Sequence, residues 1–195
     1  MPLIDAESSM VLVIDAQQRF YPPERADVDV AALHEMFARA AWLVAVASRL
    51  GVPVVVTEED ASVHGETAAV VRGVLPKDAP VLPKWTFGSD ANPEILAAIE
   101  ATAAGTTILV GLETDVCVAH SALGLQERGK RVVAVHDALY SPGAAHGNGL
   151  GRMERAGVEL VSAKELVYDW LRTVPATRAF FRSNPDLEDP PGFSL

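Results

Sequence analysis

Four short runs of consecutive apolar residues, rich in β-branched side chains, constrain the fold of this chain more than any other feature of its sequence. A strand that is apolar on both faces is typical of a parallel sheet covered by helices, whereas a sheet with one solvated face alternates apolar and polar residues. Two weaker runs bring the predicted number of strands to six. The predicted strands cover residues 10–14, 52–57, 80–84, 106–110, 131–136 and 158–161.

Helical patterns alternate with these strands. They cover residues 30–50, 92–103, 115–128, 144–156 and 163–171. Glycine, which readily ends a helix in the left-handed conformation, stands at four predicted transitions from helix to strand: Gly51, Gly105, Gly129 and Gly157. The alternation predicts a three-layer α/β/α fold with a six-stranded, mainly parallel sheet, and right-handed crossovers give the strand order 3-2-1-4-5-6.

A chain of 195 residues, of which 49% are apolar, is expected to form one domain over residues 1–195. Its last stretch, residues 173–195, combines several prolines with aromatic residues, which predicts an irregular tail that packs instead of remaining solvated. Since such a tail is costly to leave in water, we expect a homo-oligomer of two or more chains. The residues concerned are Pro175, Phe180, Phe181, Pro185, Pro190, Pro191 and Phe193.

The charge balance excludes several classes of partner. There are 16 basic and 26 acidic side chains, and the net charge of −10 opposes binding to nucleic acid and to anionic membranes. The longest apolar run in a helix, residues 40–47, is far shorter than the roughly 20 residues that span a bilayer. With a single cysteine and no pattern typical of a secretory signal, the expected location is the cytoplasm.

Two charged residues stand at the carboxyl ends of predicted strands. Asp15 directly follows the first strand, at the edge where open α/β sheets form ligand crevices; a role in capping the next turn is the alternative. Lys84 ends the third strand, between Pro83 and Trp85, and the alternative is a surface lysine whose stem packs on apolar neighbours.

The single cysteine, Cys117, lies between a predicted buried strand and a predicted helix. Thr114 and Asp115 are predicted to cap this helix, which places Cys117 in its first turn. At that position the positive end of the helix dipole favours a thiolate, and backbone N–H groups are available to an oxyanion. The alternative is an unreactive core cysteine.

The predicted topology brings these residues together. The first and fourth strands are neighbours in the order 3-2-1-4-5-6, so Asp15 and Cys117 lie side by side, and Lys84 faces the same crevice. An acid or base, a cation and a nucleophile are the groups that acyl transfer through a thioester requires.

Three segments in this order give the chain a clear resemblance to the isochorismatase-like cysteine hydrolases, which include nicotinamidases and N-carbamoylsarcosine amidases. They are VLVIDAQQRF, LPKWTFGS and GLETDVCV, and the resemblance extends over about residues 10–171. It implies a catalytic triad of Asp15, Lys84 and Cys117. It also implies a non-proline cis peptide before Glu113, which turns the Glu113 N–H, with that of Cys117, toward the substrate oxygen.

Two differences between this sequence and known branches of the family narrow the range of expected activities. Nicotinamidases bind a metal through an Asp-x-His pair and a further histidine, whereas this region reads TEEDASVHGET, so we interpret Glu58, Glu59, Asp60 and His64 as loop residues and expect no metal and no organic cofactor. The members that hydrolyse the vinyl ether of isochorismate lack the nucleophilic cysteine. Because Cys117 is present, an amide or related acyl substrate is favoured.

The sequence therefore predicts a cysteine hydrolase that cleaves a small amide or ureido C–N bond, with Asp15 as the proton carrier and Lys84 favouring the thiolate. A vinyl-ether hydrolase and a non-catalytic binding member of the fold are the alternatives. His120 is a less favoured candidate base. The predicted pocket wall, each residue of which has a core position as its alternative, is formed by Gln17, Phe20, Trp85 and Phe87.

Overall fold

The computed structural model describes residues 2–188, 190–192 and 194, and their central element is a six-stranded sheet with the order β3-β2-β1-β4-β5-β6. Every pair of neighbouring strands is parallel, so the predicted fold class and strand order are confirmed. The strands are β1 (Ser9–Ile14), β2 (Val54–Glu59), β3 (Val81–Lys84), β4 (Thr106–Leu112), β5 (Arg131–Tyr140) and β6 (Glu159–Val161).

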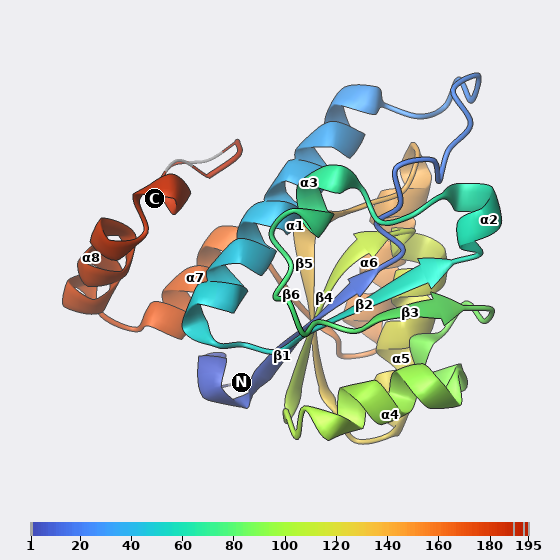
Figure 1. The fold of residues 1–195 in the computed structure, drawn as a ribbon. Coiled ribbons are helices and arrows are strands. Elements are labelled where there is room, and N and C mark those ends of the chain that lie inside the picture. The colour runs from blue at the N-terminus through green and yellow to red at the C-terminus, as the bar shows by residue number, and fades with distance from the viewer. Residues whose placement is uncertain (1, 189, 193, 195) are drawn as a thin grey trace.

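Helices cover both faces of this sheet (Figure 1). Two separate clusters of buried apolar residues lie between the layers, one on each face. On one face lie α1 (Val30–Leu50), α3 (Ala69–Arg72) and α7 (Ala163–Leu171). On the other lie α4 (Pro93–Ala101), α5 (Ala119–Glu127) and α6 (Ala144–Arg155). The short α2 (Ala61–His64) follows β2.

Helix α1 is long and apolar enough to cross a membrane by length and composition alone, but half of its most apolar stretch is buried inside the protein. Its buried residues, among them Phe37, Leu43 and Val46, belong to the core cluster on one face of the sheet. Asp29 caps its first turn, and Gly51 ends it in the left-handed conformation, as predicted. The helix therefore packs as a core element of the α/β fold.

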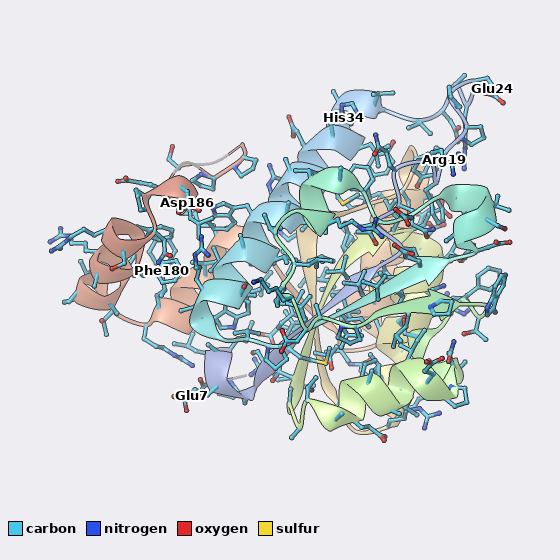
Figure 2. The ribbon with its side chains drawn as sticks, viewed as in Figure 1. Glu7, Arg19, Glu24, His34, Phe180 and Asp186 are labelled. Carbon is cyan, nitrogen blue, oxygen red and sulfur yellow. The ribbon has the colours of Figure 1, made fainter. Side chains whose placement is uncertain are left out.

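The prediction of an irregular tail is wrong for residues 174–183. They form α8 (Val174–Ser183), because Thr173 accepts a hydrogen bond from the Ala176 N–H and Pro175 lies in the first turn, where proline costs no helical hydrogen bond. Figure 2 labels Phe180 and Asp186 in this C-terminal segment, which contacts α7 and α1. Phe193 lies outside the described residues.

Two helix ends differ from the prediction. The left-handed residue before β4 is Ala103 (φ 56°) and not Gly105, so the chain turns two residues earlier than the glycine pattern indicates. The predicted helix over residues 115–128 divides into a π-helical turn, Thr114–Val118, followed by α5. A π-helical turn is rare, and it commonly marks a functional site.

Gly111 controls how closely β4 approaches β1 beside the carboxyl edge of the sheet. It is the register partner of Ile14, the last residue of β1, and its φ is 118°. A methyl group at this position would overlap the Ile14 carbonyl oxygen. Only glycine permits this approach, and it brings Asp15 next to the turn that follows β4.

Candidate active site

Asp15 is fully buried at the carboxyl end of β1 and has an unusual backbone conformation, with φ 48°. Its N–H bonds to the Thr57 carbonyl oxygen (3.1 Å), and the Thr57 hydroxyl donates to Asp15 Oδ1 (2.7 Å). The left-handed conformation, which aspartate tolerates better than most residues, directs the chain away from the sheet immediately after the strand. Thr57 on the neighbouring strand thus fixes one oxygen of the carboxylate.

Lys84 is the largest fully buried side chain that the structure describes. Its Nζ lies 2.9 Å from Asp15 Oδ2, and it donates to the carbonyl oxygen of Thr86 at 2.7 Å. The surface-lysine alternative is thereby excluded, since a buried ammonium requires a paired charge and further hydrogen-bond acceptors.

Cys117 lies in the π-helical turn after β4, with 2% of its surface exposed. The predicted caps do not cap this turn: Glu113 occupies the N-cap position, Thr114 contacts His146, and Asp115 accepts from the Ser141 hydroxyl. These contacts join the turn to α6 and to the residue after β5. They hold the backbone that carries the thiol.

The thiol is close to the lysine and to a carboxylate that the sequence analysis assigned to a loop. Lys84 Nζ lies 3.5 Å from Cys117 Sγ, which in turn lies 3.1 Å from Glu59 Oε2. The same Glu59 oxygen lies 3.2 Å from Lys84 Nζ. Asp15, Lys84 and Cys117 therefore converge as predicted, but Glu59 is the carboxylate within hydrogen-bond distance of the thiol.

Glu59 was missed because the predicted second strand ended at Thr57. The strand continues through Glu58 and Glu59, and Glu59 is the register partner of Lys84 on β3. Glu58 accepts hydrogen bonds from Thr67, so it serves the loop and not the site. If the second strand is extended until it pairs with the whole of the third strand, Glu59 falls opposite Lys84. This pairing is the signal that could have located Glu59.

Burial and charge determine the protonation of this cluster. Burial raises the pKa of the Asp15 carboxyl although Lys84 acts in the opposite direction. Burial also raises the pKa of the Cys117 thiol, and the nearby Asp15 charge adds to this effect. For Lys84, burial disfavours the ammonium, but attraction to Asp15 and Cys117 outweighs it and the pKa is raised. These shifts favour a charged lysine and a protonated thiol, so burial opposes the thiolate that the position near a helix start favours.

The four predicted pocket residues have different environments. Gln17 is fully buried and donates to the backbone carbonyl oxygens of Glu59 and Gly65, which is the core position that was its alternative. Phe20 is partly buried and stacks on His64. Trp85 and Phe87 are exposed, at 71% and 56%.

His120 is exposed and contacts the Phe87 ring edge-on. No hydrogen bond described in the structure joins it to Cys117, whose partners are Lys84 and Glu59. The predicted cis peptide before Glu113 is also wrong: no peptide bond between described residues is cis, and Glu113 has extended backbone angles. The energetic preference of a non-proline peptide for the trans form agrees with this geometry.

Asp15, Glu59 and Cys117 also present three potential metal ligands within 4.8 Å of one another. However, the Lys84 ammonium lies within 3.5 Å of an atom of each residue. A second cation in the same space would be repelled by Lys84 and would have to displace its hydrogen bonds. The lysine therefore already occupies the space among these donors, and the set does not fit a metal.

Comparisons with known proteins identify the family and the fold. The model of the isochorismatase domain matches residues 9–165. Mouse isochorismatase domain-containing protein 2A is 27% identical over 85% of this chain and 76% of its own length. Among solved structures, the MAR1 ribonuclease from Caenorhabditis elegans is similar with a TM-score of 0.82 and 23% identity, over 98% of this chain and 97% of its own.

The YcaC gene product of Escherichia coli, described as an octameric hydrolase of unknown specificity, is similar with a TM-score of 0.77 and 22% identity. The similarity covers 95% of this chain and 92% of that protein. At this identity the two solved structures establish the shared fold. The family model, which spans most of the chain including all four residues of the cluster, shows that this protein belongs to the isochorismatase domain family and is a hydrolase of that superfamily.

Proposed function

We propose that this protein is a cysteine hydrolase that cleaves a small amide or ureido C–N bond through a thioester. The observation that carries this proposal is the placement of Cys117 Sγ, 3.5 Å from a buried lysine and 3.1 Å from a carboxylate oxygen. A thiol held beside both a cation and a proton acceptor is arranged for nucleophilic catalysis.

In the first half of the reaction the Cys117 proton moves to a carboxylate of the cluster, and Sγ attacks the substrate carbonyl carbon. The Lys84 charge lowers the cost of the transient thiolate, which burial otherwise opposes. When the tetrahedral intermediate collapses, the C–N bond breaks and the leaving nitrogen takes the proton. We assign the proton transfer to Asp15, as the family resemblance implies, and the stabilisation of the oxyanion to the backbone N–H of Cys117. The Glu113 N–H is left out, because its role depended on a cis peptide that is trans in the structure.

In the second half, water attacks the thioester carbon, the C–S bond breaks and the thiol is regenerated. An amide yields an amine or ammonia and a carboxylic acid, and a ureido group yields a carbamic acid. No step requires an organic cofactor. The proposed substrate is a small molecule. The negative net charge of the chain opposes nucleic acid and anionic membranes as partners.

A substrate screen tests this function directly. Primary amides, N-carbamoyl compounds and isochorismate are incubated with the protein, and release of ammonia is measured beside release of pyruvate. We expect ammonia from members of the first two groups. Pyruvate from isochorismate, with no ammonia from any amide, would instead support vinyl-ether hydrolysis, for which Cys117 is not required.

Activity is expected to be independent of a metal. After incubation with excess EDTA and removal of the chelator, amide hydrolysis should remain within about twofold of the untreated protein, because the Lys84 ammonium already lies against both carboxylates. Metal content is measured on the same sample. Loss of activity with EDTA and recovery on adding zinc would show that Asp15, Glu59 or Cys117 binds a metal.

We also propose that the protein is one domain, is cytoplasmic and forms a homo-oligomer. The octameric YcaC structure supports the assembly, and so does the apolar C-terminal segment, in which Phe180 is only partly buried. Light scattering of the purified protein measures the number of chains directly.

A further inference from the structure

Glu59 differs from the other members of the cluster in its exposure. The side chains of Asp15 and Lys84 have no exposed surface and Cys117 is 2% exposed, whereas the Glu59 side chain is 23% exposed. Glu59 is thus the most exposed of the four side chains, and its Oε2 is 3.1 Å from Sγ. A substrate group bonded at Sγ would therefore lie close to this carboxylate.

The position of this carboxylate is fixed by its backbone. Gln17 Oε1 accepts from the Glu59 N–H at 2.8 Å, and Gln17 Nε2 donates to the Glu59 carbonyl oxygen at 2.9 Å. Glu59 also pairs with Lys84 in the register of β2 and β3. The buried Gln17 thus fastens the end of the strand, and the carboxylate is a built feature of the site and not a mobile surface charge.

The cluster carries an excess negative charge. Two carboxylates, Asp15 and Glu59, face one lysine, and the Cys117 thiol donates a hydrogen bond to Glu59 Oε2. Asp15 lies closer to Lys84 and is fully buried, so the uncompensated charge falls at Glu59, the member open to solvent. The outer oxygen of Glu59 faces the His64 ring, whose Nε2 lies 3.7 Å from Glu59 Oε1 and which stacks on Phe20.

We infer that Glu59 selects a substrate that carries a cationic group near its scissile carbonyl and disfavours one that carries a carboxylate there. This inference rests on the proposed function, because it assigns the substrate class of the same site. A positive group placed against Glu59 would compensate the excess charge while the carbonyl carbon lies at Sγ. A carboxylate in the same place would add a third negative charge beside one lysine.

Charged thiol reagents test the inference without any turnover. The rates at which 2-aminoethyl and 2-sulfonatoethyl methanethiosulfonate modify Cys117 are measured by mass spectrometry at one fixed pH, and their ratio is divided by the ratio for N-acetylcysteine. We expect a corrected preference for the cationic reagent of about tenfold or more, from the field of one close charge. The chain has one cysteine, so every adduct reports this site.

Glu59→Gln keeps the size of the side chain and removes the charge, and it should reduce the preference to within about threefold of the free thiol. Asp60→Asn is the matched control, because it removes an equal charge one residue away whose carboxylate bonds to Ser62. The control should retain the parent ratio. An unchanged ratio in Glu59→Gln, a parent ratio equal to that of the free thiol, or no reaction with the cationic reagent would each overturn the inference.

Hydrolysis of three amides of similar size but different charge tests this inference separately from the proposed function. They are β-alaninamide (cationic), butyramide (neutral) and succinamate (anionic), and we expect kcat/KM to fall in that order, with the order flattened in Glu59→Gln. Equal hydrolysis of the three would contradict the inference while supporting amide hydrolysis. No hydrolysis of any amide, with the reagent preference intact, would instead remove the proposed function and leave the charge selectivity of the site supported.

Discussion

Replacement of Cys117 with alanine is expected to reduce amide hydrolysis by more than about 10⁴-fold, because the one cysteine of the chain is the proposed nucleophile. Water would then have to attack the substrate directly, without the covalent intermediate that divides the reaction into two easier steps. The measurement is ammonia release from the best substrate of the screen. Activity within tenfold of the parent would contradict the covalent mechanism.

The same variant should remain folded. Cys117 is 2% exposed and packs in the core cluster beneath α5, so alanine removes one buried sulfur atom and leaves a small void. A void of this size costs about 1 kcal/mol. Circular dichroism and a melting curve establish that loss of activity is not loss of structure.

His120→Ala is the control for this experiment. His120 is three positions after Cys117 in the sequence but is exposed, so we expect hydrolysis to remain within about threefold of the parent. A parallel sample quenched during turnover should show the mass of an acyl group on Cys117 in the parent and on no residue in Cys117→Ala. This adduct would identify the thioester itself.

The strand order and the convergence of the triad residues were predictable because both follow from one rule. In a parallel sheet all carboxyl ends lie at the same edge, so residues such as Asp15 and Lys84 that end separate strands must face one crevice. The apolar runs located the strands, and right-handed crossovers ordered them.

Glu59 was not predictable in the same way, since it depends on how far a strand extends. Charged residues at 58 and 59 resemble the start of a loop, and only the register with β3 shows that they continue the sheet. Gln17 illustrates a related difficulty. A polar residue just after a strand suggests a pocket, whereas its role here depends on backbone partners more than forty residues away.

The C-terminal helix and the thiol protonation show two further limits of sequence patterns. The helix α8 tolerates Pro175 because it falls in the first turn, and counting prolines does not distinguish this position from the interior. The position of Cys117 near a helix start favours a thiolate, but burial and the charges of Asp15 and Glu59 outweigh that effect. The second conclusion requires the buried environment, which no local motif encodes.

Replacement of Lys84 with methionine is expected to abolish hydrolysis and to lower the free energy of unfolding by about 3–5 kcal/mol near neutral pH. Methionine keeps most of the buried volume, but Asp15 is then a buried carboxylate without its cation, 0% exposed. The free energies of unfolding of the variant and of the parent protein, both desalted, are compared by urea unfolding. A loss of less than about 1 kcal/mol would show that the buried ion pair does not stabilise the fold.

The pH dependence of this loss has a definite sign. Burial raises the pKa of Asp15 in the folded parent and Lys84 lowers it, so removal of Lys84 raises it further. Between the unfolded value of about 3.9 and this higher folded value, the folded variant binds a proton that the unfolded chain has released. Stability of Lys84→Met therefore falls as pH rises through this window, and the deficit relative to the parent should shrink on acidification from about pH 7.5 to about pH 5.

The double variant Asp15→Asn/Lys84→Met tests whether the Asp15 carboxylate causes the loss of stability and its pH dependence. Asparagine keeps the hydrogen bond from the Thr57 hydroxyl and tolerates the left-handed backbone at position 15. With no carboxylate left to protonate, the deficit at neutral pH should be smaller than in Lys84→Met, and most of its pH dependence should disappear, while hydrolysis stays absent. If the double variant loses stability with rising pH as steeply as Lys84→Met, the titrating group is not Asp15, and Glu59, the second carboxylate in contact with Lys84, becomes the group to remove next.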